Sequence, residues 1–165
     1  MSRSNPILVA ANEETTANLN ETINQAAQLA TTNQTHVEIL YVFTDGMDDY
    51  RELTENLGFD NRPGAEPDPD NVSARQETVR QIKSELREQG ITVQVKGRIG
   101  ELSDEILAVA DTVDAGQIIV GGKKRSATGK LVFGSAAQSV LMNASAPVTF
   151  LRSDTDSEKK QKLFN

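Results

Sequence analysis

Residues 6–11 read PILVAA, a run of apolar side chains with no polar interruption. A strand that is buried on one face only alternates apolar and polar residues, whereas a strand buried on both faces is apolar throughout. So short a run suits a strand better than a helix. We therefore expect these residues to form a central strand of a parallel sheet with helices on both sides.

A second apolar run, QIIV at residues 117–120, has the same character. β-Branched and aromatic residues favour further strands at 36–43 and 148–151, and alternating valines favour one at 91–97. Apolar residues at helical spacing predict four helices between the strands, at about 14–32, 72–86, 102–110 and 135–144. The predicted order is β-α-β-α-β-α-β-α-β.

Strands that alternate with helices require a parallel sheet with right-handed crossovers. The sequence thus predicts an α/β fold with a single doubly wound five-stranded parallel sheet, of strand order 3-2-1-4-5, and helices on both faces. Ligands of such sheets bind beyond the carboxyl ends of the strands, where the winding reverses. Strands one and four are then neighbours, so Asn12 and the loop that opens at Gly121 border the crevice.

The composition narrows the function classes. A chain of 165 residues suits one domain. Its net charge of -7 argues against a nucleic-acid partner, and the absence of cysteine removes disulfides, thiolate metal sites and cysteine nucleophiles. The opening MSRSNP holds no signal-like apolar region, and no apolar run approaches about 18 residues. We expect a cytoplasmic protein with no membrane partner.

Residues 121–135 read GGKKRSATGKLVFGS, with four basic side chains and no acidic one. Ser135 to Gln138 fits a capping box, with Ser135 as the N-cap of the fourth helix. The free N–H groups of a helix N-terminus bind anions, and Gly134 would allow close approach. The basic side chains add positive charge: Lys123, Lys124, Arg125 and Lys130. A polyphosphate site fits these features, and the alternative is a capped helix behind a solvated loop.

Other phosphate and catalytic motifs fail on spacing. Gly122 and Gly129 are too far apart for a P-loop, and residues 10–14 hold no glycine for a dinucleotide fingerprint. The Gly-x-Ser-x-Gly motif is missing, and His36, the single histidine, opens a strand away from the crevice and is expected to be structural. Residues 117–135 contain no carboxylate that could hold a metal for phosphoryl transfer. We therefore expect no enzyme, with slow ATP hydrolysis left open.

The stretch resembles the nucleotide loop of the universal stress protein family, which reads Gly, two residues, Gly, nine residues, Gly, then Ser or Thr. Gly121 and the Gly134-Ser135 pair match this pattern. The run 138–141, the segment 146–148, the opening ILVA at 7–10 and the turn around Gly100 extend the resemblance over most of residues 6–152.

The resemblance implies an adenine nucleotide, ATP or AMP, with Mg²⁺ only if ATP binds. The base would lie near Asn12 and Val42, at the ends of strands one and two. The residues near the phosphates would come from the loop and the helix behind it: Gly121, Gly122, Lys124, Arg125, Gly134 and Ser135. It also implies a homodimer through the edge strand Val148–Leu151.

Two positions depart from the family pattern. Lys124 stands where the second loop glycine is usual, and Asn12 stands where an aspartate usually faces the nucleotide. A lysine loses easy access to positive φ but brings charge. An asparagine donates and accepts hydrogen bonds without supplying a carboxylate, and it could equally be the N-cap of helix one.

The segment 44–70 carries nine acidic and two basic residues. We interpret 1–152 as one universal stress protein domain with 44–70 as an acidic insertion or loop, and 153–165 as a polar tail. The insertion is either an acidic lid over the basic loop or a solvated linker. Two functions follow: a universal stress protein-like regulator that binds an adenine nucleotide at the junction of strands one and four, or a nucleotide-independent dimeric interaction protein.

Overall fold

The computed structural model describes residues 5–12, 18–59, 66–125 and 131–152, without the side chains of 122–133 and 152. The strands are β1 (Ile7–Ala11), β2 (Val37–Phe43), β3 (Val93–Ile99), β4 (Gln117–Arg125), β5 (Leu131–Phe133) and β6 (Val148–Arg152). The helices are α1 (Leu19–Asn33), α2 (Met47–Asn56), α3 (Pro69–Ser73), α4 (Glu77–Glu88), α5 (Leu102–Val113) and α6 (Ser135–Asn143).

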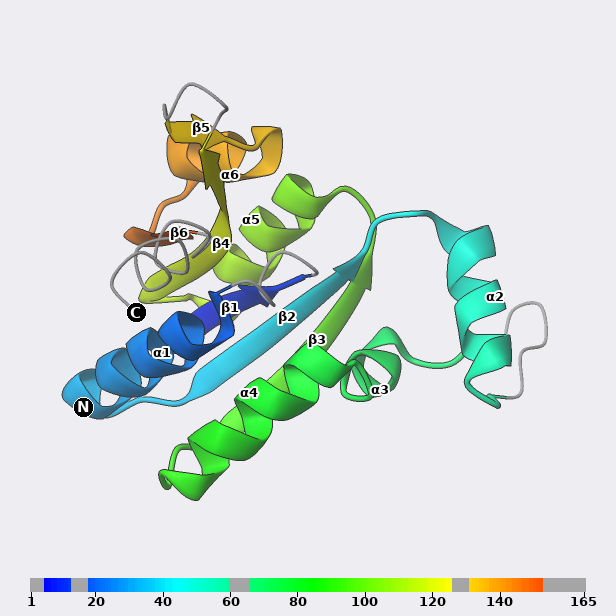
Figure 1. Ribbon diagram of the computed structural model, residues 1–165, viewed down its shortest axis with the longest axis horizontal. Helices are drawn as coiled ribbons and strands as arrows, with labels where there is room; N and C mark the ends of the chain where they lie inside the picture. The colour runs from blue at the N-terminus through cyan, green and yellow to red at the C-terminus, as the bar shows by residue number, and fades with distance from the viewer. Residues whose placement is uncertain (1–4, 13–17, 60–65, 126–130, 153–165) are drawn as a thin grey trace, which may run out of the picture.

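Strand β1 lies at the centre of the sheet, parallel to β2 on one side and to β4 on the other (Figure 1). Strand β3 continues the sheet beyond β2, and β6 pairs in parallel with β4. The parallel strands therefore run β3-β2-β1-β4-β6, which confirms the predicted order 3-2-1-4-5 and the doubly wound α/β fold.

The sheet separates two hydrophobic cores. Ile7 and Val9 face the core that α1 and α4 cover, whereas Leu8 and Ala10 face the core under α5 and α6. Every residue of β1 is buried. The uninterrupted apolar run at 6–11 follows directly, because neither face of this strand meets water.

Some predicted bounds were wrong. Helix α1 begins at Leu19 with Asn18 as its N-cap, and the predicted start at residue 14 lies outside the described residues. The helix predicted at 72–86 is two helices, since α3 ends at Ser73 and α4 begins at Glu77. Strand β4 runs past Gly121 and pairs with β5 in the antiparallel sense. Part of the expected loop is therefore a β-ribbon, because Leu131–Phe133 favours extended backbone.

The segment 44–70 is more regular than the sequence suggested, because it contains α2 and the start of α3. Helix α2 stands at one end of the molecule (Figure 1) and packs through Tyr50, whose ring meets that of Phe43 edge-on at a centroid distance of 5.0 Å. The Tyr50 hydroxyl donates to the Pro67 carbonyl, and Arg51 forms a two-pronged ion pair with Glu66. The described parts of the segment, 44–59 and 66–70, are thus packed together.

Among the described residues, no helix is long and apolar enough to cross a bilayer.

Candidate functional site

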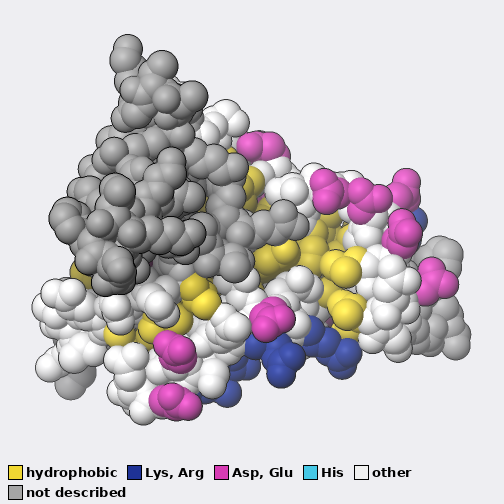
Figure 2. All heavy atoms as spheres, viewed as in Figure 1, with side chains coloured by type: hydrophobic (Ala, Val, Ile, Leu, Met, Phe, Trp, Pro, Cys, Tyr) yellow, Lys and Arg dark blue, Asp and Glu magenta, His cyan; other side chains and the backbone are white. Residues whose placement is uncertain are grey.

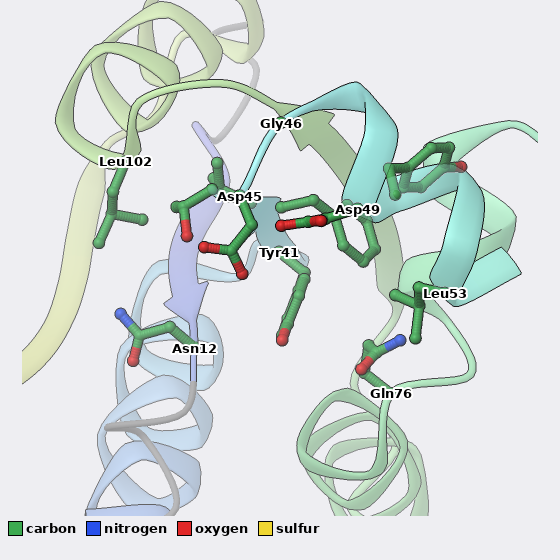
Figure 3. A pocket seen from close by; sticks show the side chains of 12 residues that line it. Asn12, Tyr41, Asp45, Gly46, Asp49, Leu53, Gln76 and Leu102 are labelled. Carbon is green, nitrogen blue, oxygen red and sulfur yellow. The ribbon is translucent and has the colours of Figure 1, made fainter. Parts of the chain in front are cut away.

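A cleft of about 520 Å³ opens at the carboxyl edge of the sheet, beside the end of β1. Tyr41 of β2 pairs with Ala11 of β1, so the next residues, Asn12 and Val42, lie side by side at this edge. Both line the cleft. Figure 3 shows Asn12, Tyr41 and Asp45 around one common space, with Leu102 on the opposite wall. The cleft thus lies on the β1 side of the predicted switch point.

The remaining walls come from the acidic segment and from two helices. Leu102 begins α5, and Gln76 precedes α4. The residues contributed by the segment after β2 include both charged and apolar side chains: Thr44, Asp45, Gly46, Asp49, Tyr50 and Leu53. Gly46 has φ +92°, which a side chain would strain, and this turn allows α2 to start directly above the cleft.

The described walls of the cleft carry negative charge. Asp45 and Asp49 are exposed, and Figure 3 shows both carboxylates directed toward the cleft. Among the described residues that line the cleft there is no Lys or Arg, and the side chains of 122–133 lie outside the described part of the chain. The described residues contain no cluster of three or more His, Asp or Glu side chains that could hold a metal ion. Phosphates would therefore be repelled from this end of the site, and a neutral or amino-bearing group would be favoured.

The N-termini of α5 and α6 lie near this edge, and they differ in whether their backbone N–H groups are free to bind a ligand. Glu101 caps α5 by accepting from the backbone N–H groups of Ser103 and Asp104, at 3.3 and 3.1 Å. A hydrogen bond from the Ser103 hydroxyl, with these backbone bonds, lowers the pKa of Glu101. The same carboxylate raises the pKa of Asp104. The α5 terminus is thus already occupied by a carboxylate from its own chain.

The α6 terminus has no such cap. Gly134 is its N-cap residue and has no side chain to cap the helix, and the first turn holds no acidic residue. The predicted capping box is therefore wrong: Ser135 is already helical, so its hydroxyl is not in the N-cap position. Gly134 and Ser135 are both exposed. Within the described residues, the N-cap position therefore leaves the first-turn N–H groups to an anion.

Gly121 has a packing role in the structure. A Cβ atom there would lie 3.1 Å from Nδ2 of Asn18, the N-cap residue of α1. That amide in turn donates to the Leu151 carbonyl at 3.3 Å. The absence of a side chain at 121 allows β4, β6 and α1 to meet closely. Because Asn18 is the N-cap of α1, the alternative reading of Asn12 as that cap was wrong.

The predicted site residues are thus distributed over two places. Asn12 and Val42 line the cleft, whereas Gly134 and Ser135 form the α6 terminus. The backbones of Gly122, Lys124 and Arg125 lie in β4, where Lys124 pairs with Val132. Their side chains, and the whole of Lys130, lie outside the described part of the chain. His36 precedes β2 at the opposite edge of the sheet, 3.8 Å from the buried Glu38.

The sequence predicted the acidic segment as either a lid over the basic loop or a solvated linker, and the structure places its first part in the wall of the cleft. Asp45, Asp49 and Tyr50 line it, yet only their position after a strand end could have indicated this. Leu102 and Gln76 were not among the predicted site residues. Their place at helix starts on the carboxyl edge is the signal that was available.

Known proteins resemble this chain in sequence as well as in fold. The model of the universal stress protein family matches residues 4–152. The chain belongs to that family. A curated universal stress protein of Mycolicibacterium smegmatis is 30% identical over 76 residues, which span 46% of this chain and 58% of that relative. The matched region therefore spans little more than half of that relative's length.

Solved structures agree in fold. The universal stress protein of Archaeoglobus fulgidus is 28% identical, with a TM-score of 0.63 over 88% of this chain and 96% of the other. A second structure of the universal stress protein from that organism, in complex with dAMP, is 24% identical, with a TM-score of 0.57 over 88% and 95% of the two chains. A universal stress protein in complex with cAMP is 16% identical, with a TM-score of 0.58 over 92% and 99%.

Proposed function

We propose that this universal stress protein binds an adenine nucleotide, ATP or AMP, at the junction of β1 and β4 and acts as a regulator. The observation that carries the proposal is the cleft of about 520 Å³ beside Asn12 and Val42, a size usual for small-molecule sites. Relatives of the same fold were solved with dAMP and with cAMP. The family and the cleft together support a nucleotide of this class.

The charges support one orientation of the ligand. The base faces Asn12, whose amide donates and accepts hydrogen bonds, and the apolar wall made by Val42 and Leu102. The phosphates lie away from Asp45 and Asp49, over the uncapped N-terminus of α6 at Gly134 and Ser135. Mg²⁺ accompanies the ligand only if it is ATP, where it would partly neutralise the phosphates.

We propose binding and regulation without catalysis. A nucleotide in the cleft contacts the segment that begins at Thr44. Its binding therefore biases the position of α2 and of the acidic surface that α2 carries. The alternative function is a dimeric interaction protein that works without nucleotide. The carboxylates of Asp45 and Asp49, which have no basic neighbour among the described lining residues, favour that alternative because they weaken the binding of any anion.

Measurements on the purified protein distinguish nucleotide binding from the nucleotide-independent function. Native mass spectrometry and the ultraviolet absorbance of heat-released material should reveal co-purified AMP or ATP. Titration calorimetry should then give saturable binding of ATP and AMP at low salt. Binding of ATP should weaken as salt screens the attraction between its phosphates and the positive N-terminus of α6. No saturation by any adenine nucleotide up to about millimolar concentration, which corresponds to about -4 kcal/mol, would overturn the proposal.

A further inference from the structure

Helix α4 carries a basic flank that nothing in the proposed function uses. Arg80, Lys83 and Arg87 lie within an arc of about 60° of the helix, because successive residues turn by about 100°. They line a shallow groove of about 560 Å³ together with Ala74, Ser84 and Glu88. Arg80 and Arg87 are exposed, and none of the three basic side chains has an ion-pair partner within the described residues.

Helix α2 carries an acidic face with the complementary spacing. Asp48, Glu52 and Glu55 also lie within about 60° of one another, opposite the buried Tyr50 and Thr54. All three are exposed, and the Asp48 side chain is 99% accessible. Asp48 lies 3.7 Å from Arg51, whereas Glu52 and Glu55 make no ion pair in the described part of the chain.

The spacings match when the two helices run in opposite directions. From Arg80 the next basic residues follow after three and then four positions, about 4.5 and 6 Å along the axis. From Glu55 backwards, the acidic residues also follow after three and then four positions. An antiparallel arrangement therefore brings three pairs opposite one another at once: Glu55 with Arg80, Glu52 with Lys83 and Asp48 with Arg87.

The two faces belong to separate places in one chain. Figure 1 shows α3 between α2 and α4, and Figure 2 shows the basic side chains gathered over the α3 and α4 region, apart from the acidic ones around α2. The pairing is thus available only between two molecules. A long polyanion fits the groove less well, because Glu88 lines it and the chain is acidic overall.

We propose that two copies of this chain associate through the acidic face of α2 on one and the basic flank of α4 on the other. The occupant of the groove is therefore a second copy of the chain, held by three antiparallel ion pairs. Exposed ion pairs are individually weak, so the association is concentration-dependent and sensitive to salt. This surface is distinct from β6, the strand for which the family resemblance implies pairing.

A charge-swap experiment tests the contact. The variants are R80E/K83E/R87E, which makes α4 acidic, D48K/E52K/E55K, which makes α2 basic, and the sixfold combination, which keeps the wild-type net charge. In sedimentation velocity at low salt, the wild type and the sixfold variant should each form a larger species than either threefold variant, because the threefold variants lose the contact between α2 and α4. A mixture of the two threefold variants should associate again, because each helix then meets its opposite charge.

Raising the salt to about 1 M, where the Debye length is about 3 Å, should dissociate the wild-type contact. Any association through β6 is common to all variants and cancels in the comparison. The proposal is overturned if R80E/K83E/R87E sediments like the wild type, or if the mixture of threefold variants fails to associate.

A second measurement does not depend on the variants. Carbodiimide joins carboxylates to lysines in direct contact, so it should link Glu52 to Lys83 in the wild type. A mixture of heavy-isotope-labelled and unlabelled protein should give linked peptides with one labelled and one unlabelled half. Absence of such mixed peptides at concentrations where the protein associates would contradict the proposed contact.

Discussion

The backbone N–H of Gly97 donates a 2.7 Å hydrogen bond to Oδ1 of Asp70, across 27 residues of sequence. Gly97 lies on β3, which pairs only with β2 in the described sheet and is therefore an edge strand. Unpaired N–H groups at an edge invite pairing with other chains. Asp70 covers this one, and its carboxylate also lies 3.4 Å from Arg98. The end of the acidic segment thus protects the sheet edge.

Gly97→Ala should destabilise the protein strongly. A Cβ atom there would lie 2.1 Å from the Pro69 carbonyl oxygen, a backbone atom that moves only with α3. Overpacking of this kind costs about 3 kcal/mol or more, which urea unfolding would measure as a lower midpoint. Gly100→Ala is the matched control, because its new Cβ meets the flexible Glu105 carboxylate. Equal losses in the two variants would contradict the proposed reason.

Ser73→Ala should stabilise the protein. The Ser73 hydroxyl is fully buried and has no hydrogen-bond partner within the described residues. A buried unsatisfied hydroxyl carries a desolvation penalty, so its removal should raise the unfolding free energy by about 1 kcal/mol. Thermal and urea unfolding of the variant would measure this gain. A loss of stability would mean that a partner, such as a bound water, satisfies the hydroxyl in solution.

Alkaline pH should destabilise the protein through Tyr50. Burial, and then the charges of Asp68, Asp70 and Glu66, raise the pKa of Tyr50 from 10 to about 12. Above pH 10 the unfolded chain loses a proton that the folded chain retains, so stability falls until the pH reaches about 12. Tyr50→Phe should remove this pH dependence and cost about 1 kcal/mol at neutral pH, because the hydrogen bond to Pro67 is lost. Unfolding free energies measured from pH 8 to 12 provide the test, and an unchanged slope in Tyr50→Phe would refute it.

The fold could be predicted from the sequence because the patterns that indicate its strands lie within short stretches of the chain. The apolar runs at 6–11 and 117–120 identify the two strands at the switch point, since only strands covered on both faces are apolar throughout. The α2 helix was missed because its buried face rests on Tyr50 and Thr54, and its packing depends on the distant residues Glu66 and Pro67. Asp68-Pro69 was a readable helix start, with a capping side chain before a proline at the first turn.

The candidate site was harder to predict because it joins distant segments. Asn12 and Val42 were correctly placed at the carboxyl edge, since strand order alone determines that position. The capping error at Ser135 arose because a Gly-Ser pair fits two N-cap registers, and Gly134 takes the cap in the structure. The two carboxylates in the described wall of the cleft, Asp45 and Asp49, lie on either side of the turn at Gly46, whose positive φ the sequence did not reveal (Figure 3).

Pairing through the edge strand β6 is expected to depend on Val148. The Ile118 N–H donates to the Pro147 carbonyl, so Pro147 and Thr149 direct their backbone groups toward β4, and Val148 directs its N–H outward. Val148→Pro should therefore remove an outward donor and weaken a β6 dimer about tenfold without breaking the β4 ladder. Thr149→Pro should instead destabilise the monomer. Sedimentation equilibrium and thermal unfolding separate the two effects, and a monomeric wild type would rule out this dimer.

The carboxylates of the cleft should select against phosphate. Asp45 and Asp49 line the cleft, and no basic residue is among its walls in the described part of the chain, so neutralising them should strengthen the binding of ATP more than that of adenosine. Two unit charges about 10 Å apart in water repel by about 0.4 kcal/mol. The two carboxylates together oppose each ligand charge by about 0.8 kcal/mol before screening, so D45N/D49N should bind ATP at least about fourfold more tightly.

The matched control for that variant is D48N/E52Q, which removes the same number of charges from α2 at positions that do not line the cleft. Its effect on ATP binding should be smaller, because exposed charges farther from the ligand are screened by solvent and salt. Titration calorimetry with ATP, AMP and adenosine at low and high salt would compare the three proteins. If D45N/D49N instead loses affinity for adenosine, the carboxylates contact the base or the ribose directly, and their role is recognition and not repulsion.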